Sequence, residues 1–156
     1  QSTLDLDLSV RQNLRYFAAL HGLSGRDADR RIDGALERLG MLERAGEKAR
    51  ALNGGHRRRT EIARALLHVP KVLLLDEPTV GLDAPSRRLL TDHVHGLCRD
   101  TGVTVLWATH LTDEVADGDQ VILLHQGRIL ADGPAGDLRG AVPLPEYFAT
   151  MTRVPA

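Results

Sequence analysis

The sequence has little of the chemistry that marks disulfide-bonded, secreted or membrane-spanning proteins. Its one cysteine, Cys98, cannot form an internal disulfide, which is typical of a reducing compartment such as the cytoplasm. The simplest interpretation of Cys98 is a small buried residue on a helix. The longest apolar runs, such as residues 72–75, are far shorter than the ~18 residues that a membrane-spanning helix needs. No basic segment followed by an apolar one stands at the N-terminus, so we expect no signal peptide.

The chain also has no excess of charge of either sign. Its 156 residues carry a formal net charge of −1, with 42% hydrophobic and 26% charged residues, the composition of an ordinary soluble globular domain. This length suffices for one compact domain with a core and is short for two. Since basic and acidic residues nearly balance, the net charge does not favour binding to nucleic acid or to an anionic membrane.

The first third of the chain is predicted to be helical. Apolar residues at helical spacing predict a helix over residues 9–22. Ser24 and Asp27 form a capping-box pattern that predicts the start of a second helix, which we expect to end near Gly40. The buried face of that helix is expected to carry Ile32, Leu36 and Leu39. A loop over residues 43–51 and a third helix over 57–68, with a buried stripe of Ile62, Ala63 and Leu66, are predicted to follow.

From Lys71 onward the pattern predicts strands that alternate with helices. The unbroken apolar run 72–75 is typical of a strand buried on both faces of a parallel sheet, and residues 103–107 predict a second strand. Between them we expect a helix over residues 85–99, with an inward face of Leu89, Leu90, Val94 and Leu97. A short helix (111–116) and a hairpin (121–124 and 128–131, joined by Gln126-Gly127) are predicted to follow. The sequence therefore predicts a mixed α/β domain with a helical insertion.

The strongest candidate for a catalytic site is the carboxylate pair Asp76-Glu77, which follows the apolar run. In open parallel sheets, ligands bind at the C-terminal ends of the strands. Since adjacent residues of a strand point in opposite directions, Asp76 can hold Mg²⁺, directly or through water, while Glu77 orients an attacking water. Pro78 is expected to hold Glu77 in an extended conformation. Taken alone, the same run is interpreted equally well as a strand that ends in a polar turn.

A histidine follows the second predicted strand. Residues 103–107 run into Ala108-Thr109-His110, which places His110 just beyond the C-terminal end of that strand. A lone histidine in such a position is usually structural. Beside a metal–phosphate site, His110 becomes a candidate contact for a terminal phosphate.

A third candidate element is the segment Leu52-Asn53-Gly54-Gly55-His56, which is followed at once by Arg57. Two glycines let the backbone approach an anion closely, and a helix that starts there directs free N–H groups at it. The alternative is an ordinary glycine turn that caps a helix. The triplet Arg57-Arg58-Arg59 is interpreted as a solvated face with packing salt bridges, because no aromatic platform for nucleic acid accompanies it.

In this order and spacing, the elements resemble the nucleotide-binding domains of ABC transporters. Residues 52–56 resemble the Leu-Ser-Gly-Gly-Gln signature and residues 72–77 resemble the Walker B strand. Gly81-Leu82-Asp83 resembles the D-loop, and His110 resembles the switch histidine. The resemblance extends over nearly the whole chain and implies a P-loop NTPase-like α/β core with a helical subdomain.

The resemblance implies an ATPase that works as a dimer, in which each nucleotide lies between the phosphate loop of one subunit and the signature of the other. Asn53, Gly54, Gly55 and His56 would then bind the ATP of a partner. Asp76 would support Mg²⁺, Glu77 would act as general base, His110 would sense the γ-phosphate and Asp83 would couple the two sites. Two residues depart from the family pattern, since Asn53 replaces serine and His56 replaces glutamine. The amide of Asn53 can still donate a hydrogen bond to a phosphate.

The family's phosphate loop, G-x-x-x-x-G-K-[ST], is absent from these residues, since no Gly-Lys pair occurs. The sequence also begins with Gln1 and not with methionine, so we expect a piece cut just downstream of that loop and inactive alone. By family spacing, Gln1 is either the Q-loop glutamine or the residue immediately after it, with a slight preference for the latter. We expect a partial ABC ATPase domain over residues 1–156: a helical subdomain at about 9–50, the signature helix and catalytic core at about 51–133, and a tail at about 134–156.

The resemblance further implies an ATPase subunit of an exporter, because residues 10–40 are similar to exporting members and only a short tail follows residue 133. The expected partners are a second copy of the subunit and a transmembrane permease, with no nucleic acid, and the expected location is the cytoplasmic face of the membrane. Three alternatives remain: a soluble ABC protein of translation, a DNA-repair ATPase of the same superfamily, and a non-catalytic regulatory fragment. The short helical segment before Leu52 speaks against the DNA-repair class, whose members carry long coiled coils there.

Overall fold

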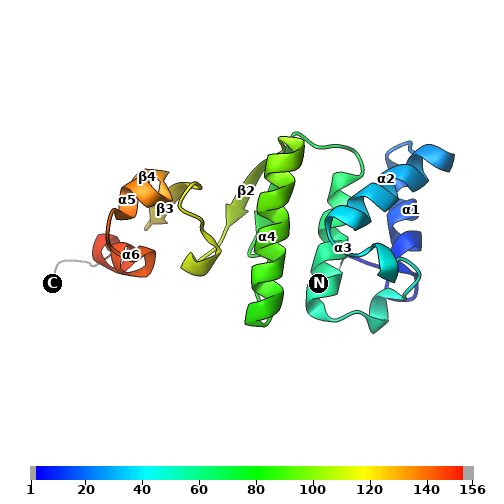
Figure 1. The fold of residues 1–156 in the computed structure, drawn as a ribbon, viewed down its shortest axis with the longest axis horizontal. Helices are drawn as coiled ribbons and strands as arrows, with labels where there is room; N and C mark the ends of the chain where they lie inside the picture. Colours follow the sequence, from blue (N-terminus) through cyan, green and yellow to red (C-terminus); the bar gives the residue numbers. More distant parts are fainter. Residues whose placement is uncertain (1–2, 153–156) are drawn as a thin grey trace. The chain divides into compact units, whose positions relative to one another are not determined.

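The computed structural model describes residues 3–152, and the chain divides into two compact units, residues 1–108 and 109–156, which are described separately. The first unit contains four helices and a pair of strands among its described residues (Figure 1). In chain order these are α1 (Val10–Leu20), α2 (Gly25–Arg38), α3 (Gly54–Leu66), β1 (Val72–Asp76), α4 (Ala84–Thr101) and β2 (Thr104–Ala108). Two short 3₁₀ turns, Leu42–Arg44 and Ala49–Ala51, lie in the segment predicted as a loop.

The helices α1, α2 and α3 pack against one another around an aliphatic core. Ser9 caps α1 through a complete capping box, because its hydroxyl accepts from the Gln12 N–H and the Gln12 side chain accepts from the Ser9 N–H. The prediction for the inward face of α2 is confirmed, since Ile32, Leu36 and Leu39 are fully buried. Gly40 follows the helix with φ +59°, the left-handed conformation that ends many helices.

The predicted capping box at the start of α2 is wrong. Ser24 occupies the N-cap position of α2, but its side chain makes no capping hydrogen bond. The Asp27 carboxylate pairs instead with Arg30 and Arg31 at 2.8 and 3.0 Å. The Asp27 carboxylate would have completed the capping box by accepting from the Ser24 N–H. It bonds to the two arginines one turn further along α2 instead, because hydrogen bonds between two ionised groups are stronger than those to a neutral N–H.

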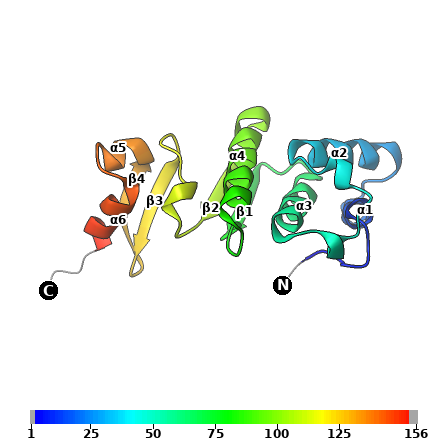
Figure 2. The same cartoon turned by 60° about the horizontal axis from the view of Figure 1, so that its bottom comes forward.

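The strands β1 and β2 form a parallel pair in which Leu73 lies opposite Val105 and Leu74 opposite Leu106. One face of this pair packs on the core, where Leu73 is 6% exposed. The other face is open, with Leu74 71% and Leu106 59% exposed. The prediction that residues 72–75 are buried on both faces is therefore wrong for this structure, because the described residues of the first unit place α4 and the other helices on one face only (Figure 2).

Helix α4 lies between β2 and the α1–α3 group in Figure 1. Its buried stripe consists of Leu90, Val94 and Leu97, which repeat at intervals of four and three residues. Leu89 was predicted to face inward as well and is instead 44% exposed. Leu89 precedes Leu90 of the stripe by one residue, so its side chain is turned about 100° around the helix axis from that of Leu90. Cys98 lies on the same helix and is partly buried against the core.

The second unit is built on the predicted hairpin, formed by β3 (Gln120–His125) and β4 (Arg128–Pro134). Gln126 and Gly127 both have positive φ, 48° and 73°, as a type I′ turn requires. The helices α5 (Ala135–Arg139) and α6 (Leu144–Thr152) follow, and the predicted helix at 111–116 is a 3₁₀ turn at Thr112–Glu114. Arg139 anchors α5 through two bonds to the Asp117 carboxylate, 2.9 and 2.7 Å long.

The observed elements confirm the predicted mixed α/β class with a helical group ahead of the strands. No helix within residues 3–152 is long and apolar enough to cross a lipid bilayer.

Candidate functional site

The carboxylate pair lies where the sequence predicts it, at the C-terminal end of β1. Asp76 is exposed and pairs with Ala108 at the end of the parallel ladder. Glu77 extends the ladder by one bond, since its N–H donates to the Ala108 carbonyl oxygen over 2.9 Å. The two residues therefore lie at the strand end, where parallel sheets bind their ligands, with Asp76 exposed and Glu77 half-buried.

The backbone of Glu77 differs from the prediction. Pro78 was expected to hold Glu77 extended, yet Glu77 has φ +45°, in the left-handed region. A residue other than glycine seldom adopts this conformation, which costs about 1–2 kcal/mol. The chain reverses direction at this point, and the Val80 N–H donates back to the Glu77 carbonyl oxygen at 3.2 Å. Strained residues of this kind cluster at active sites.

His110 lies in the second unit, two residues beyond Ala108 in the chain. It is exposed and precedes the 3₁₀ turn Thr112–Glu114. The Leu111 N–H after it bonds to the Thr109 hydroxyl at 3.0 Å, which orders the turn that carries the histidine. The prediction that His110 directly follows the second strand agrees with the end of β2 at Ala108.

The glycine segment forms the first turn of α3, which begins at Gly54, three residues before the predicted start. Asn53 is the N-cap, and its Oδ1 accepts a 2.8 Å bond from the His56 N–H. Glycine has low helix propensity, so the sequence predicts that α3 starts after the two glycines. The hydrogen bond from the asparagine N-cap offsets the cost of placing glycines in the first turn. Since Oδ1 is used by the cap, the Nδ2 amide is the group of Asn53 that can donate to an anion.

The two glycines are packed against the segment that leads into α4. A Cβ placed on Gly54 would lie 3.3 Å from Cδ2 of Leu82. A Cβ placed on Gly55 would lie 3.2 Å from both Cβ and Oγ of Ser86, and Gly55 is buried. The signature-like segment and the D-loop-like segment are therefore brought together, although about thirty residues separate them in the sequence.

Asp83 is the N-cap of α4, and its Oδ1 accepts a 2.7 Å bond from the Ser86 N–H. This backbone hydrogen bond, followed by one from the Ser86 hydroxyl, lowers the pKa of Asp83 below its ordinary value. The carboxylate is thus held ionised at the helix N-terminus, where negative charge is favourable.

His56 lies in a cationic environment at the start of α3. Burial lowers the pKa of His56 first, and the nearby charges of Arg59 and Arg44 lower it further. Burial and Arg59 likewise lower the pKa of His93 on α4. Arg59 itself donates to the Leu39 carbonyl oxygen at 3.1 Å. Both histidines are therefore biased towards the neutral form, in which each ring keeps one acceptor nitrogen.

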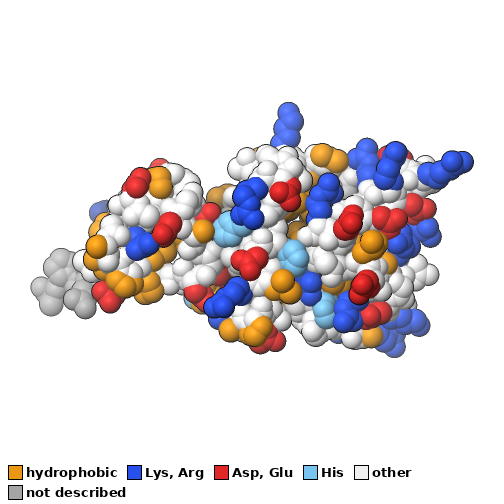
Figure 3. All heavy atoms as spheres, viewed as in Figure 1, with side chains coloured by type: hydrophobic (Ala, Val, Ile, Leu, Met, Phe, Trp, Pro, Cys, Tyr) orange, Lys and Arg blue, Asp and Glu red, His pale blue; other side chains and the backbone are white. Residues whose placement is uncertain are grey.

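The arginine triplet has a structural role, as predicted, but its three residues are half-buried and do not form a solvated face. Arg57 donates to the carbonyl oxygens of Ala49 and Arg50, at 3.2 and 3.0 Å, and Arg58 pairs with Glu61 at 3.1 Å. In the space-filling view, Lys and Arg side chains alternate with Asp and Glu over the helical part of the first unit (Figure 3). Many of these arginines form ion pairs, for example Arg11 with Asp33.

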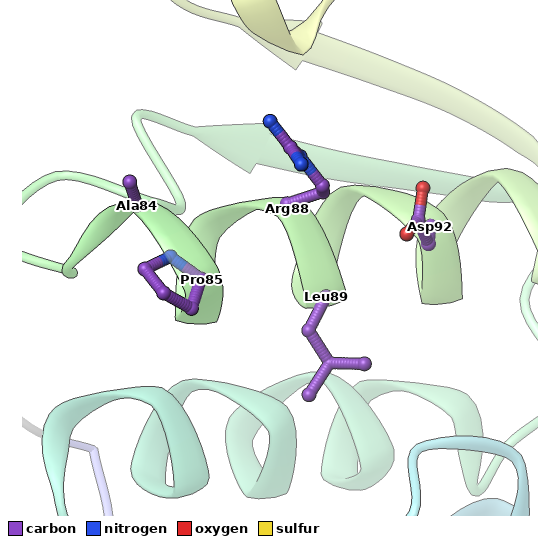
Figure 4. Close-up of a pocket in the computed structure, with 5 residues that line it drawn as sticks. All are labelled: Ala84, Pro85, Arg88, Leu89 and Asp92. Carbon is purple, nitrogen blue, oxygen red and sulfur yellow. The ribbon is translucent and has the colours of Figure 1, made fainter.

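A hollow of about 410 Å³ runs along the first half of α4, beginning beside the Asp83 cap, and Figure 4 shows the residues that line it. Leu89 points from α4 towards α3, whereas Arg88 points to the opposite side (Figure 4). The lining consists of Ala84, Pro85, Arg88, Leu89 and Asp92. Leu89 lines this hollow and is 44% exposed.

Two further predictions concern Gln1 and the metal. Gln1 lies outside the described residues. Within residues 3–152 no group of three or more His, Cys, Asp or Glu side chains could hold a metal ion. Asp76 still fits Mg²⁺, because Mg²⁺ usually binds one or two carboxylates together with substrate phosphates and water, and Asp76 presents an exposed carboxylate.

Sequence reasoning missed Ser86 as part of the site, and it named Leu82 only as a member of the D-loop-like segment. The spacing Asp83-x-x-Ser86 is a signal that could have indicated the contact between these two residues, since an N-cap bonds to the third residue of its helix. Nothing in the sequence indicates that Ser86 and Leu82 meet Gly55 and Gly54, because these contacts depend on how α3 packs against α4.

The chain has the fold of the P-loop NTPase-like α/β ATPase domains. Residues 1–80 match the family described as ABC transporter, and the chain belongs to that family. The predicted family is therefore confirmed.

Individual relatives agree with this assignment. The chain is 37% identical over 132 residues to the linearmycin resistance ATP-binding protein LnrL of Bacillus subtilis, which covers 84% of this chain and 42% of LnrL. It is 39% identical over 136 residues to the Nod factor export ATP-binding protein I of Cupriavidus pinatubonensis, and the match covers 86% of this chain and 42% of that protein. The solved structure of CbiO1 from Clostridium perfringens, part of the ABC transporter complex CbiONQ, superposes with a TM-score of 0.79 at 30% identity over 86% of this chain and 54% of that one. The chain thus spans about half or less of the length of these proteins.

Proposed function

We propose that the protein containing this chain is the ATPase subunit of a membrane exporter. The observation that carries the proposal is the carboxylate pair at the end of β1, where Glu77 adopts a left-handed conformation after Asp76 at the end of a parallel ladder. Family membership supports ATP as the nucleotide.

In the proposed reaction, Glu77 is the general base. Its carboxylate accepts a proton from the water that attacks the γ-phosphate of ATP. The bond from its N–H to Ala108 fixes the backbone from which that side chain extends. Asp76 would hold Mg²⁺, directly or through water, and Mg²⁺ would neutralise charge on the phosphates. His110 donates to the γ-phosphate.

The start of α3 acts on the nucleotide of a second copy of the subunit. The Nδ2 amide of Asn53 and the backbone N–H groups of Gly54 and Gly55 donate to its phosphate oxygens, since the first N–H groups of a helix have no partner within the helix. His56 borders the same nucleotide. Asp83, held against this turn through Ser86, links the two sites of the dimer.

Export is supported by the relatives whose names refer to resistance and to Nod factor export. The solved relative belongs to a transporter complex, which supports a permease partner for this protein. The helices α1 and α2 would dock on that permease, so the subunit would lie on the cytoplasmic face of the membrane. The domain limits remain those expected from the sequence, a helical subdomain at about 9–50 and a catalytic core at about 51–133.

The test is ATP hydrolysis by the purified full-length protein with and without Mg²⁺, for the wild type and for His110→Ala. We expect Mg²⁺-dependent hydrolysis that His110→Ala reduces strongly while the circular dichroism spectrum is unchanged. Unfolding of His110→Ala would assign a structural role to the histidine. A full-length protein that hydrolyses no ATP with Mg²⁺ and its permease present would contradict the proposed function.

A further inference from the structure

Ser86 connects two segments that lie far apart in the sequence. In the first turn of α4 its N–H donates to Asp83 Oδ1 at 2.7 Å. Its Cβ and Oγ also lie 3.2 Å from the position that a Cβ on Gly55 would occupy. One serine thus contacts both the residue that caps α4 and a buried glycine in the first turn of α3.

We propose that Gly55 is a glycine because Ser86 fills the space of its side chain, and that Ser86 is thereby a positioning residue for the nucleotide-contacting end of α3. The inference rests on the proposed function, in which that end of α3 binds the nucleotide of a second subunit. It assigns the requirement for glycine at position 55 to a contact within the subunit and not to the approach of a phosphate.

The backbone conformation of Gly55 does not require glycine. Gly55 is helical and is not among the glycines with positive φ, so alanine can adopt the same φ and ψ. The requirement is one of space. Rotation about χ1 can move the Oγ of Ser86, but its Cβ is fixed to the backbone of α4. Carbon atoms pack best at about 3.5–4.0 Å, so a methyl group 3.2 Å from this Cβ displaces one helix against the other.

Gly54 offers a contrast within the same turn. A Cβ there would meet Cδ2 of Leu82 at 3.3 Å, the terminal methyl group of a flexible side chain. Leu82 can rotate away, so Gly54 does not fix the spacing of the helices. Of the two glycine contacts, that of Gly55 with Ser86 is therefore the one that sets the distance between the start of α3 and the start of α4.

The consequence is that Asn53 and Asp83, the two N-caps, are held at one spacing. In the dimer both would then reach the partner subunit together. A change at Ser86 should alter contacts made between subunits while leaving nucleotide binding within one subunit intact.

The test uses the full-length protein and a non-hydrolysable ATP analogue, with dimerisation measured by sedimentation and monomer binding by fluorescence. We expect Gly55→Ala to weaken analogue-dependent dimerisation about fivefold or more without changing monomer binding, since the lower end of the usual cost of overpacking corresponds to about that factor. Ser86→Gly removes the opposing Cβ, so Gly55→Ala/Ser86→Gly should dimerise within about threefold of Ser86→Gly alone. Ser86→Ala keeps the Cβ and should not rescue Gly55→Ala.

The outcomes separate this inference from the proposed function. A wild type that forms no dimer with the analogue counts against the proposed function. If the wild type dimerises, two results would overturn the role of Ser86. One is a Gly55→Ala variant that dimerises as well as the wild type, and the other is a Gly55→Ala variant that Ser86→Gly does not rescue. If Gly55→Ala unfolds, recovery of its thermal midpoint by Ser86→Gly supports the contact, and failure to recover overturns it.

Discussion

The backbone N–H of Glu77 donates a 2.9 Å hydrogen bond to the carbonyl oxygen of Ala108. Glu77 lies one residue beyond Asp76, which forms the last pair of the parallel ladder with Ala108. The bond holds Glu77 at the strand end although its φ of +45° is unfavourable for a side chain. The structure therefore keeps a carboxylate in a strained position at the place where a parallel sheet binds its ligand.

This strain predicts that Glu77→Gly stabilises the full-length protein while it abolishes hydrolysis. Glycine adopts positive φ without a steric cost, so we expect the free energy of unfolding to rise by about 1 kcal/mol. Urea denaturation measures the change. Val69→Gly is the matched control, because Val69 also has positive φ, 54°, and also precedes a proline. It should stabilise the protein without loss of ATPase activity. A Glu77→Gly variant less stable than the wild type would contradict the strain.

Asn53 is expected to have two separable roles. Its Oδ1 caps α3, and its Nδ2 is the proposed donor to the partner's ATP. Asn53→Ser keeps an acceptor and a donor and should be close to neutral. Asn53→Asp keeps the cap but loses the donor, so stability should hold while ATP-dependent dimerisation weakens. Asn53→Ala should lose the cap, about 1 kcal/mol of stability, and a phosphate bond of roughly 1.5–3 kcal/mol.

Thermal unfolding and sedimentation of the full-length variants with ATP measure these two roles. Monomer binding of ATP should be the same in all of them, because the contact is made with a second subunit. Equal dimerisation by Asn53→Ser, Asn53→Asp and Asn53→Ala would remove Asn53 from the nucleotide site.

Stability should depend on pH through His56 and His93. Burial and Arg59 lower the pKa of both below the ordinary 6.5. The Leu89 backbone and Asp92 oppose the shift at His93, and Glu47 opposes it at His56, but only in part. Below pH 6.5 the unfolded chain therefore binds more protons than the folded one, and stability falls until the folded pKa is passed. We expect His56→Gln/His93→Gln to lose less stability than the wild type between about pH 7 and pH 5. Identical pH profiles from urea denaturation would contradict this.

The open face of the β1–β2 pair predicts that the isolated chain self-associates. Leu74 and Leu106 are paired in the register and are both largely exposed. Exposed apolar strand surfaces without charge or proline favour aggregation. Leu74→Arg/Leu106→Arg should yield more monomer in size-exclusion chromatography, whereas Leu20→Arg, at a 65% exposed leucine on α1, should not. A wild-type chain that stays monomeric would contradict this prediction.

Most of the elements could be predicted from the sequence, because each depends on local periodicity or on turn chemistry. The stripe of Ile32 and Leu36 predicts α2, and Gln126-Gly127 predicts the hairpin. The position of Asp76 and Glu77 followed from the apolar run before them.

The departures have non-local causes. The pairing of Asp27 with arginines removed a predicted capping box, and the chain reversal at Glu77 overrode the preference of a residue before proline. Leu74 is exposed because helices cover only one face of the β1–β2 pair. Gly55 and Ser86 meet because α3 packs against α4. None of these can be read from spacing along the chain.

The central claim is that Glu77 is the general base of an ATPase, and the Glu77→Gln variant of the full-length protein tests it most directly. Glutamine keeps the size of the side chain and the N–H that bonds to Ala108 but cannot accept a proton at neutral pH. We expect ATP binding and ATP-dependent dimerisation to be retained while the single-turnover rate of hydrolysis falls by ~10²–10⁴-fold. Hydrolysis at the wild-type rate by a correctly folded Glu77→Gln protein would contradict the account.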